Sequence, residues 1–512
     1  MQAPLAALLL LPPPVLAADP QAHPDVRPAV RSWRQANEAQ VLRELAAFVA
    51  IPNLASDATN IRKNAEHASA MLARRGVSTR LLESPGSPPA VYGELKVPGA
   101  RRTVMVYAHY DGQPVDPAAW ATPPWTPTLR TGTLEEKAPA VDLATLAPPI
   151  GPEWRLYGRS TSDDKSPIVA AAAALDALAK AKRAPSVNLK FFLEGEEEAG
   201  SEHLQAMLQT HRDLLAADLW LLCDGPVHQT RRPQVYFGVR GVMGVELTLY
   251  GPARALHSGH YGNWAPNPAV ELAQLIGSLR DSAGRILIAG FGDDVRPSTA
   301  AERDALRSVP PVEDELKAAL ALGRVEGEGA SLPELIMRPA LNVRGVASGK
   351  VGAAAANAVP TEAQASIDFR LVPDQTPEGV RSKLEAHLRG LGYHVVHETP
   401  DGATRRAHPR LVKLEWGPGY KAARTALDHP AALALVRVLE AGGQPIVKLP
   451  TLGGSVPMHL FGDVTGAPVV GLPIVNHDNN QHAANENVRI QNLWDGIEAF
   501  AMVFAGLGPA WP

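Results

Sequence analysis

The chain has 512 residues, with 49 Lys or Arg against 53 Asp or Glu, so its formal net charge is −4. This length exceeds the roughly 250–300 residues that a single hydrophobic core supports, which predicts two domains or one domain with a large insertion. The near balance of charge argues against a nucleic-acid-binding protein, and the single cysteine, Cys223, excludes an internal disulfide bond and a cysteine-based zinc finger.

Residues 1–18 have the pattern of a secretory signal peptide. An apolar run from Leu5 to Leu11 precedes three prolines, and Ala17 and Ala18 fit a small-residue cleavage site. The run is too short to cross a bilayer, and no later segment contains 18 consecutive apolar residues. We therefore expect an exported protein, periplasmic or secreted, with no membrane span. The protein would be cytoplasmic if this leader is not a signal peptide.

The chain before residue 242 alternates predicted helices with short apolar strands. Residues 114–153 interrupt this alternation with a proline-rich segment that predicts a long surface loop. The alternation is typical of an α/β fold in which helices flank a mostly parallel sheet. The predicted helices cover 41–49, 61–75, 166–183 and 201–215, and the predicted strands cover 78–83, 90–96, 103–108, 187–193 and 218–223.

The pattern changes near residue 242. Segments 243–250 and 363–371 alternate apolar and polar side chains, as half-buried antiparallel strands do. Helices are predicted over 267–281 and 377–390, and Thr376 is the expected N-cap of the second. These elements predict an α+β domain inserted in the chain.

The α/β pattern returns after residue 412. A helix near 430–441, an apolar segment at 467–475 and a final helix near 486–506 indicate that the first domain is completed here. The predicted organisation is therefore a signal peptide at 1–18, a first catalytic part at 19–241, an inserted domain at 242–412 and a second catalytic part at 413–512.

Histidine and acidic side chains follow four of the apolar segments directly. Ligands of open α/β sheets bind beyond the carboxyl ends of the strands, so these side chains are expected at one rim. Asp163 and Asp164 precede the alanine-rich helix and add two more carboxylates. The side chains that follow the four segments are His109 with Asp111, the acidic residues of 194–198, Asp224, and His477, Asp478 and His482.

Each of these groups alone is more often structural, as a core pair, a solvated acidic turn or a helix cap. Together they place many carboxylates near one another, and these repel unless a cation lies among them. Histidine and carboxylate ligands without cysteine suit Zn²⁺, with Mn²⁺ or Co²⁺ as alternatives. The set is large enough for two divalent metal ions in each subunit.

The motifs that carry this chemistry resemble, in their order, the M20 family of metallopeptidases, and in particular its carnosinase and non-specific dipeptidase branch. The resemblance covers about residues 35–507 and implies a zinc-peptidase α/β domain with an inserted lid that forms a homodimer interface. The motifs are His109-x-Asp111, Gly158 to Lys165, Glu194-Gly195-x-Glu197-Glu198, Asp224, His257-Ser258-Gly259, Arg370 and His482.

The resemblance also implies a role for each matching residue. Asp111 would orient the first histidine ligand, and Glu197 would be the general base of catalysis. Asp163 would bridge both metal ions and be followed by a cis peptide bond. The implied metal ligands are His109, Asp163, Glu198, Asp224 and His482.

On the substrate side, the resemblance implies that Arg370 binds a substrate carboxylate through its guanidinium fork. Asn357 and Ser455 match positions of further substrate contacts. His257 matches a lid histidine that reaches the active site of a partner subunit and polarises the scissile carbonyl. Three of these residues also have a structural alternative: Arg370 as a strand salt-bridge residue, Ser455 as a turn residue and His257 as a loop histidine.

Three features depart from the family pattern. The interval from His109 to Asp163 is longer than in typical relatives, and the extra residues around 130–153 are expected to shape the rim of the site. His477 and Asp478 precede His482 and compete with it as the last ligand. His459 has no assigned role.

We therefore expect an exported dinuclear metal-dependent hydrolase that cleaves peptide bonds in dipeptides or small peptides with a free carboxylate. Its expected partners are the small peptide substrate and a second copy of the chain. Two alternatives remain open: an amidohydrolase of N-acyl amino acids on the same fold, and a non-catalytic, metal-dependent binding protein. Loss of the base would favour the binding protein, but Glu197 is present.

Overall fold

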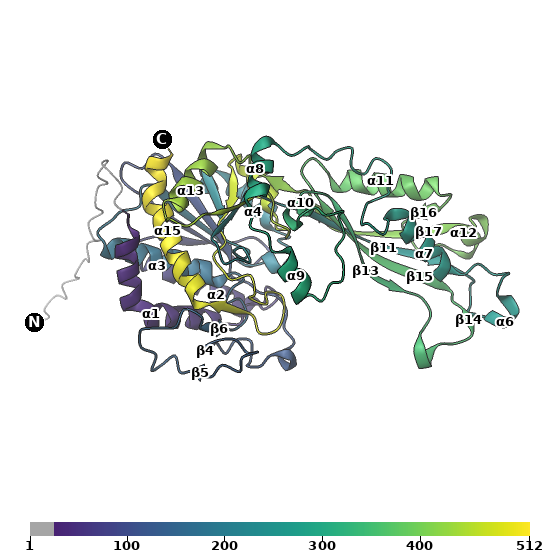
Figure 1. Cartoon of the computed structure of the whole chain (residues 1–512), viewed down its shortest axis with the longest axis horizontal. Helices are drawn as coiled ribbons and strands as arrows, with labels where there is room; N and C mark the ends of the chain where they lie inside the picture. Colours follow the sequence, from purple (N-terminus) through teal and green to yellow (C-terminus); the bar gives the residue numbers. More distant parts are fainter. Residues whose placement is uncertain (1–24, 512) are drawn as a thin grey trace, which may run out of the picture.

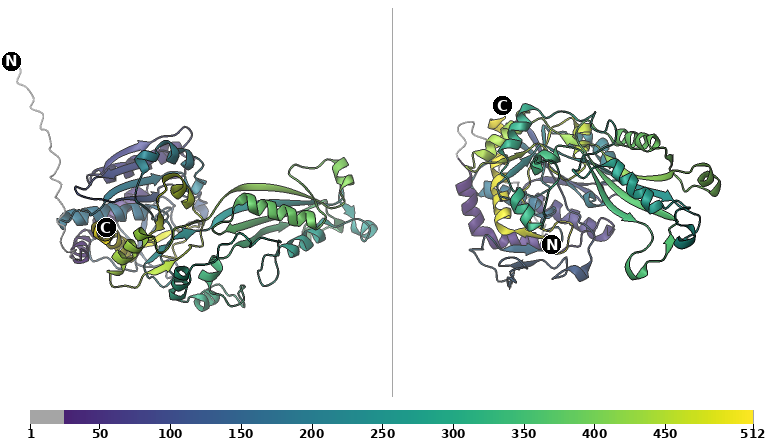
Figure 2. Two further views of the ribbon diagram at one scale, coloured as in Figure 1. Left: turned by 90° about the horizontal axis from the view of Figure 1, so that it is seen from above. Right: turned by 45° about the vertical axis from the view of Figure 1, so that its right-hand side comes forward.

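The computed structural model describes residues 25–511, so the predicted signal peptide at 1–18 lies outside the described residues. The described chain forms two lobes, a helix-flanked α/β lobe and an elongated second lobe (Figures 1 and 2). None of the described helices is both long and apolar enough to cross a membrane.

The α/β lobe is built on an eight-stranded mixed sheet. Its centre is parallel, because β7, β3, β8 and β20 run in one direction, while β1, β2 and β9 join through antiparallel pairs. The strands predicted before residue 242 are found in this sheet, and the α/β fold class is confirmed. In spatial order the strands are β1 (Ser78–Leu82), β2 (Ala90–Leu95), β7 (Asn188–Glu194), β3 (Thr103–His109), β8 (Leu219–Leu222), β20 (Val469–Gly471), β9 (Gln234–Tyr236) and β19 (Val447–Leu449).

Helices cover both faces of this sheet, and the alternation of side chains along β3 reflects this. Val104 and Val106 pack toward the larger helical layer, while Met105 and Tyr107 pack toward the smaller one. The larger layer contains α1 (Arg27–Val49), α2 (Ala58–Ala73), α3 (Lys165–Lys180), α13 (Pro430–Glu440) and α15 (Ile490–Ala510), and the smaller contains α4 (Leu204–Thr210), α5 (Arg212–Leu215) and α14 (Met458–Thr465).

The second lobe, called the lid below, is a five-stranded sheet with α7 (Pro268–Leu279) and α11 (Pro377–Gly390) on one face. Thr376 caps α11 as predicted, since its side chain accepts a hydrogen bond from the Gly379 amide. The lid also contains β12 (Leu256–His257), α6 (Ser258–Tyr261) and β14 (Ala358–Val359) at its outer end (Figure 1). Its strands are, in order, β13 (Ala340–Ala347), β15 (Glu362–Leu371), β11 (Gly241–Tyr250), β17 (Leu411–Tyr420) and β16 (His394–Val396).

The lid sheet therefore has three strands more than the two that alternation predicts. Strand β17 runs through residue 412, the predicted end of the inserted domain, and continues to Tyr420. The division at 242 and 412 itself remains a prediction. Shorter described helices are α8 (Ala300–Ser308), α9 (Glu313–Ala319), α10 (Leu332–Ile336) and α12 (Gly402–Ala407). Strands β10 (Gly238–Val239) and β18 (Ala423–Arg424), which lie where the chain enters and leaves the lid, pair with each other.

The predicted loop at 114–153 contains short strands. Within it, β4 (Thr128–Arg130) and β5 (Ala140–Val141) join β6 (Arg155–Tyr157) and β21 (Asn487–Arg489) in a four-stranded sheet. The segment is also bound to α1, because Arg43 donates hydrogen bonds to the carbonyls of Leu143 and Leu146 at 2.8 and 2.9 Å. No residue of 130–153 lines the pocket described below, so this segment packs on α1 rather than forming the pocket wall.

Candidate metal centre

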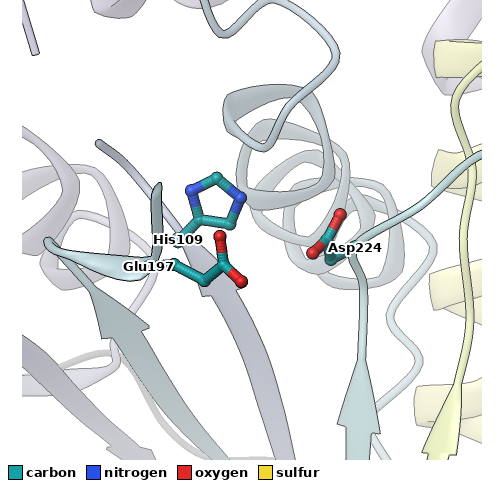
Figure 3. A group of neighbouring side chains, drawn as sticks. All are labelled: His109, Glu197 and Asp224. Carbon is teal, nitrogen blue, oxygen red and sulfur yellow. The ribbon is translucent and has the colours of Figure 1, made fainter. Parts of the chain in front are cut away.

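Six ionisable side chains converge at the carboxyl ends of the central strands, in two groups of three. In each group, one ligand atom from each residue lies within 4.8 Å of the others. His109, Glu197 and Asp224 form the first group, and Figure 3 shows their side chains facing one another. The second group contains Asp163, Glu198 and His482.

The order of strands explains why residues so far apart in sequence meet. His109 is the last residue of β3, and Glu197 and Glu198 begin the short 3₁₀ turn η2 (Glu197–Ala199) that follows β7. Asp224 follows β8. Because β7, β3 and β8 are adjacent and parallel, their carboxyl ends lie at one edge of the sheet.

Asp163 joins the two groups. Its Oδ1 lies 2.9 Å from Nε2 of His109, and its Oδ2 lies 3.2 Å from Nε2 of His482. His482 Nε2 is also 3.2 Å from Oε2 of Glu198. The peptide bond between Asp163 and Asp164 is cis, as the resemblance implies. One carboxylate thus faces both histidines.

Asp111 is buried beneath this arrangement and fixes two of its parts. Its Oδ1 lies 3.3 Å from Nδ1 of His109, on the opposite side of the ring from Asp163. Its carboxylate also accepts hydrogen bonds from the backbone amides of Glu197 and Glu198, at 3.2 and 3.0 Å. Asp111 therefore contacts both the ring of His109 and the turn that carries the two glutamates.

The electrostatics of the cluster favour a bound cation. Burial and neighbouring carboxylates raise the pKa of Asp224 to about 7, and burial raises the pKa of Glu197 well above its usual range. Hydrogen bonds to Asp163 and Glu198 raise the pKa of His482 to about 10. Although burial opposes it, hydrogen bonding from the two histidines lowers the pKa of Asp163. Four carboxylates face two histidines, so the donor set fits divalent metal ions.

His482, and neither His477 nor Asp478, is a member of the cluster. Asp478 instead accepts a hydrogen bond from Arg155 Nη2 at 2.5 Å, and His477 belongs to neither group of three. The loop between β20 and β21 therefore delivers the residue that the family spacing favours.

Two predicted substrate residues lie together beside the centre. Arg370 Nη1 donates a hydrogen bond to Ser455 Oγ at 2.8 Å, and Arg370 Nε donates to Asp368 at 3.1 Å. Ser455 lines a pocket of about 660 Å³ that is also lined by Asp163, Glu197 and the other members of the cluster except His109. This places a cationic group from the lid near the pocket that contains the candidate ligands.

The other two predicted residues, His257 and Asn357, are not in this pocket. They lie next to each other at the outer end of the lid, where the Ser258 amide donates to the Asn357 carbonyl at 2.9 Å (Figure 1). Both side chains are exposed. Within one chain, neither contributes to the metal cluster.

Several residues that support the site were missed from sequence. Gln113 donates to Glu198 at 2.7 Å, and Gln481 donates to Asp163 at 3.3 Å. Buried Glu486 accepts hydrogen bonds from the backbone that leads into Asp163. The glutamines carry no motif of their own, but their positions near Asp111 and beside His482 could have marked them.

Comparison with known proteins gives consistent matches. The model of the family described as Peptidase family M20/M25/M40 matches residues 105–505. The chain is 26% identical over 432 residues to the Beta-Ala-His dipeptidase of Rattus norvegicus, covering 82% of this chain and 80% of that protein. It is 24% identical over 485 residues to a Cys-Gly metallodipeptidase of Schizosaccharomyces pombe, covering 90% and 94%. An M20 family metallo-carboxypeptidase of Sulfolobus solfataricus superimposes with a TM-score of 0.73 at 29% identity, covering 92% and 99%.

Proposed function

The chain belongs to the peptidase family M20/M25/M40 and is a metallopeptidase, and on that basis we propose that it cleaves dipeptides or other small peptides with a free carboxylate. The observation that carries this proposal is the pairing of two features in one region. Five of the six residues of the candidate centre for two metal ions line the pocket, and the lid brings Arg370 against Ser455 of the same pocket.

In this proposal, five residues of the cluster are the metal ligands: His109, Asp163, Glu198, Asp224 and His482. Zn²⁺ suits this donor set, and Mn²⁺ or Co²⁺ are alternatives. Two such ions, when bound, supply Lewis-acid activation of water and of the peptide carbonyl.

Glu197 is the general base of the proposed reaction. Its carboxylate lies within reach of the His109 and Asp224 ligand atoms, and its pKa is raised by burial, which suits a group that takes and returns a proton. Glu197 accepts the proton of the attacking water and then donates it to the leaving amine.

Arg370 binds the free carboxylate of the substrate. Its guanidinium already donates to Ser455 Oγ and to Asp368, which hold it in place beside the pocket. A carboxylate is a suitable bidentate partner for such a fork. Anchoring the end of the peptide favours short substrates, in keeping with the dipeptides named for the relatives.

A substrate panel tests the proposal. Metal-loaded enzyme should hydrolyse dipeptides with a free carboxylate and should lose this activity when a chelator removes the ions. The same dipeptides amidated at the C-terminus should be poor substrates. Turnover of N-acyl amino acids without turnover of any dipeptide would contradict the proposed substrate class.

We also propose that the chain acts as a homodimer in which His257 serves the partner's active site. The support is the position of His257 at the outer end of the lid, outside the pocket of its own chain. Two aromatic side chains close to it in the chain, Tyr261 and Trp264, have ring centroids 6.0 Å apart and are 37% and 78% exposed. Such exposure favours a contact with another molecule, and a two-fold interface lets each lid contribute to the other site.

Subunit mixing tests the shared site. Glu197→Ala and His257→Ala subunits, each inactive alone, should regain activity when combined, because one site of the mixed dimer has both groups intact. His257→Ala should retain its metal ions. A mixture that stays inactive, with mixed dimers confirmed by mass, would place His257 outside the partner's site.

Export is proposed from residues 1–18 alone. If this segment is a signal peptide, protein recovered from the periplasm or medium should begin after residue 17 or 18. Full-length protein that remains in the cytoplasm would contradict export.

A further inference from the structure

Two stacked rings, Tyr420 and His459, line the same pocket as the metal cluster and have no role in the reaction described above. Their centroids are 5.4 Å apart and their planes differ by 15°. Tyr420 is the last residue of β17 in the lid, and His459 lies in α14 of the α/β lobe. The pair therefore closes part of the pocket between the two lobes.

The register of the lid sheet places this pair relative to Arg370. Val242 on β11 is paired with Arg370 on one side and with Tyr420 on the other. Directly paired residues of antiparallel strands project from the same face, and two strand spacings separate their backbones by about 10 Å. The neighbouring residues Met243 and Val245 pack on the opposite face, which α7 and α11 cover.

Arg370 and Tyr420 therefore project from the uncovered face of the lid sheet, within one row. Arg370 donates a hydrogen bond to Ser455. Ser455 lies just before α14 and precedes His459 of that helix by four residues. Ser455, which accepts a hydrogen bond from Arg370, and the stacked pair therefore line the same pocket. A side chain on the residue that bears the free carboxylate would reach the two rings.

The chemistry of the pair suits a flat, uncharged group. Burial lowers the pKa of His459 and raises that of Tyr420, so both rings are neutral near pH 7. Nδ1 of His459 is buried without a hydrogen-bond partner among the described residues. Leu452, Val456 and Leu460 add apolar surface to the same pocket. Aromatic rings gain from offset or edge contacts with such a wall.

We propose that Tyr420 and His459 determine specificity for the side chain of the substrate residue that carries the free carboxylate, and that they favour an aromatic ring there. This inference rests on the proposed function and adds a side-chain preference to it. It assigns no role in bond cleavage to either residue.

Competition between paired substrates tests the preference. Wild-type enzyme should prefer Gly-Phe to Gly-Leu, and Tyr420→Leu or His459→Leu should each reduce the ratio of the two kcat/KM values by about two- to tenfold, the range for loss of one aromatic contact. Tyr420→Phe keeps the ring and should keep the ratio. Because both substrates compete for the same enzyme, the ratio does not depend on how much of a variant is folded.

Two controls make the result specific. The reversed pair, Phe-Gly and Leu-Gly, carries its side chain on the other residue, so its ratio should not change in these variants. His408→Leu removes one ring of another stacked pair, His394 with His408, outside the pocket and should leave every ratio unchanged.

An unchanged ratio for Gly-Phe over Gly-Leu in both leucine variants would overturn the inference while leaving the peptidase proposal intact. An equal change in both substrate series would overturn it as well. If metal-loaded wild-type enzyme hydrolysed none of the four dipeptides, the proposed function would fail first and the inference with it.

Discussion

At the scale of single residues, Glu197 and Glu198 are adjacent in sequence and face different partners. Glu197 lies with His109 and Asp224, whereas Glu198 lies with Asp163 and His482. Their separation follows from the 3₁₀ turn after β7, whose first amides are held by the carboxylate of Asp111. One turn can therefore supply a base and a metal ligand.

Alanine at these two positions should have different consequences. Glu197→Ala should lower kcat by about 10²–10⁴-fold, the usual contribution of a general base, while both metal ions remain bound. Glu198→Ala should also lose metal, because it removes a proposed ligand. Metal content by elemental analysis of the purified variants separates the roles, and equal metal loss in both would refute the assignment of Glu197.

Arg370 should act on substrates with a free carboxylate only. Arg370→Ala is expected to lower kcat/KM for a free dipeptide. The expected loss of transition-state stabilisation is about 2–4 kcal/mol, as for loss of one partner of a desolvated charge pair. The amidated dipeptide should be cleaved poorly by wild type and be little affected by the change. Arg344→Ala, which breaks the exposed pair with Glu246 on the same sheet, is the matched control. Equal wild-type rates on free and amidated dipeptides would contradict this role.

At the scale of elements, the site depends on two loops that Glu486 binds together. The segment from Gly158 to Asp163 carries the proposed bridging carboxylate, and the loop before β21 carries His482. Glu486 accepts hydrogen bonds from the amides of Ser160, Ser162 and Asp163, from the Ser162 hydroxyl and from the guanidinium of Arg159. All of these residues are buried, so the donor groups rely on the carboxylate of Glu486 for a hydrogen-bond acceptor.

Glu486→Ala should therefore destabilise the fold and weaken metal binding together. We expect the free energy of unfolding to fall by about 3–5 kcal/mol, the range for removing one partner of a buried ion pair. Chemical denaturation of the metal-loaded protein measures this loss, and a dye-competition titration measures metal affinity. Glu440→Ala removes a partly exposed pair with Lys448 and should cost less than about 1 kcal/mol. A loss equally small for Glu486→Ala would disprove its positioning role.

Sequence patterns predicted most of the long elements. The helices α3, α11 and α15 are long enough for periodicity to be read, and Thr376 with Pro377 marks the start of α11. For α1 only the part from residue 41 to 49 was predicted, although the helix begins at Arg27. The strands β9 and β19 were missed because three residues are too few to show alternation. Strand β13 was missed because most of its side chains are exposed on an edge of the lid sheet.

At the scale of the whole molecule, the sequence predicts the chemical identity of the site better than its assembly. Ligand types at strand ends suffice to expect the metal cluster, because parallel strands bring their carboxyl ends together. Glu486, Tyr420 and His459 escape this reasoning, since their roles depend on which loops and lobes meet. His257 could be named from its motif, but its place at the outer end of the lid follows only from the fold.

The charge of the metal centre predicts a pH-dependent effect of metal on stability. Asp224 has a pKa of about 7 in the folded, metal-free chain, against about 4 for an unfolded aspartate. At a pH between these two pKa values, Asp224 is ionised in the unfolded chain but still protonated in the folded chain. The free energy of unfolding of the chelated enzyme therefore falls as pH rises from about 4 to 7. Divalent ions offset this loss by compensating the ionised carboxylates.

The increase in melting temperature on adding metal should therefore be larger at pH 8 than at pH 5. Calorimetry of metal-loaded and chelated enzyme across this range measures it, and the difference between the two cancels titration elsewhere in the molecule. Asp224→Asn removes the carboxylate and should flatten the dependence. The same increase at every pH would mean that these carboxylates do not bind the ions.

Peptide hydrolysis by this chain is proposed to depend on two metal ions held by the two groups of ligands. Titration of the chelated enzyme with Zn²⁺, while hydrolysis of a dipeptide with a free carboxylate is measured, is the decisive experiment. Activity should be absent at the start, rise with added metal and reach its plateau at two equivalents per chain. Full activity at one equivalent, or in the chelated enzyme, would contradict the account.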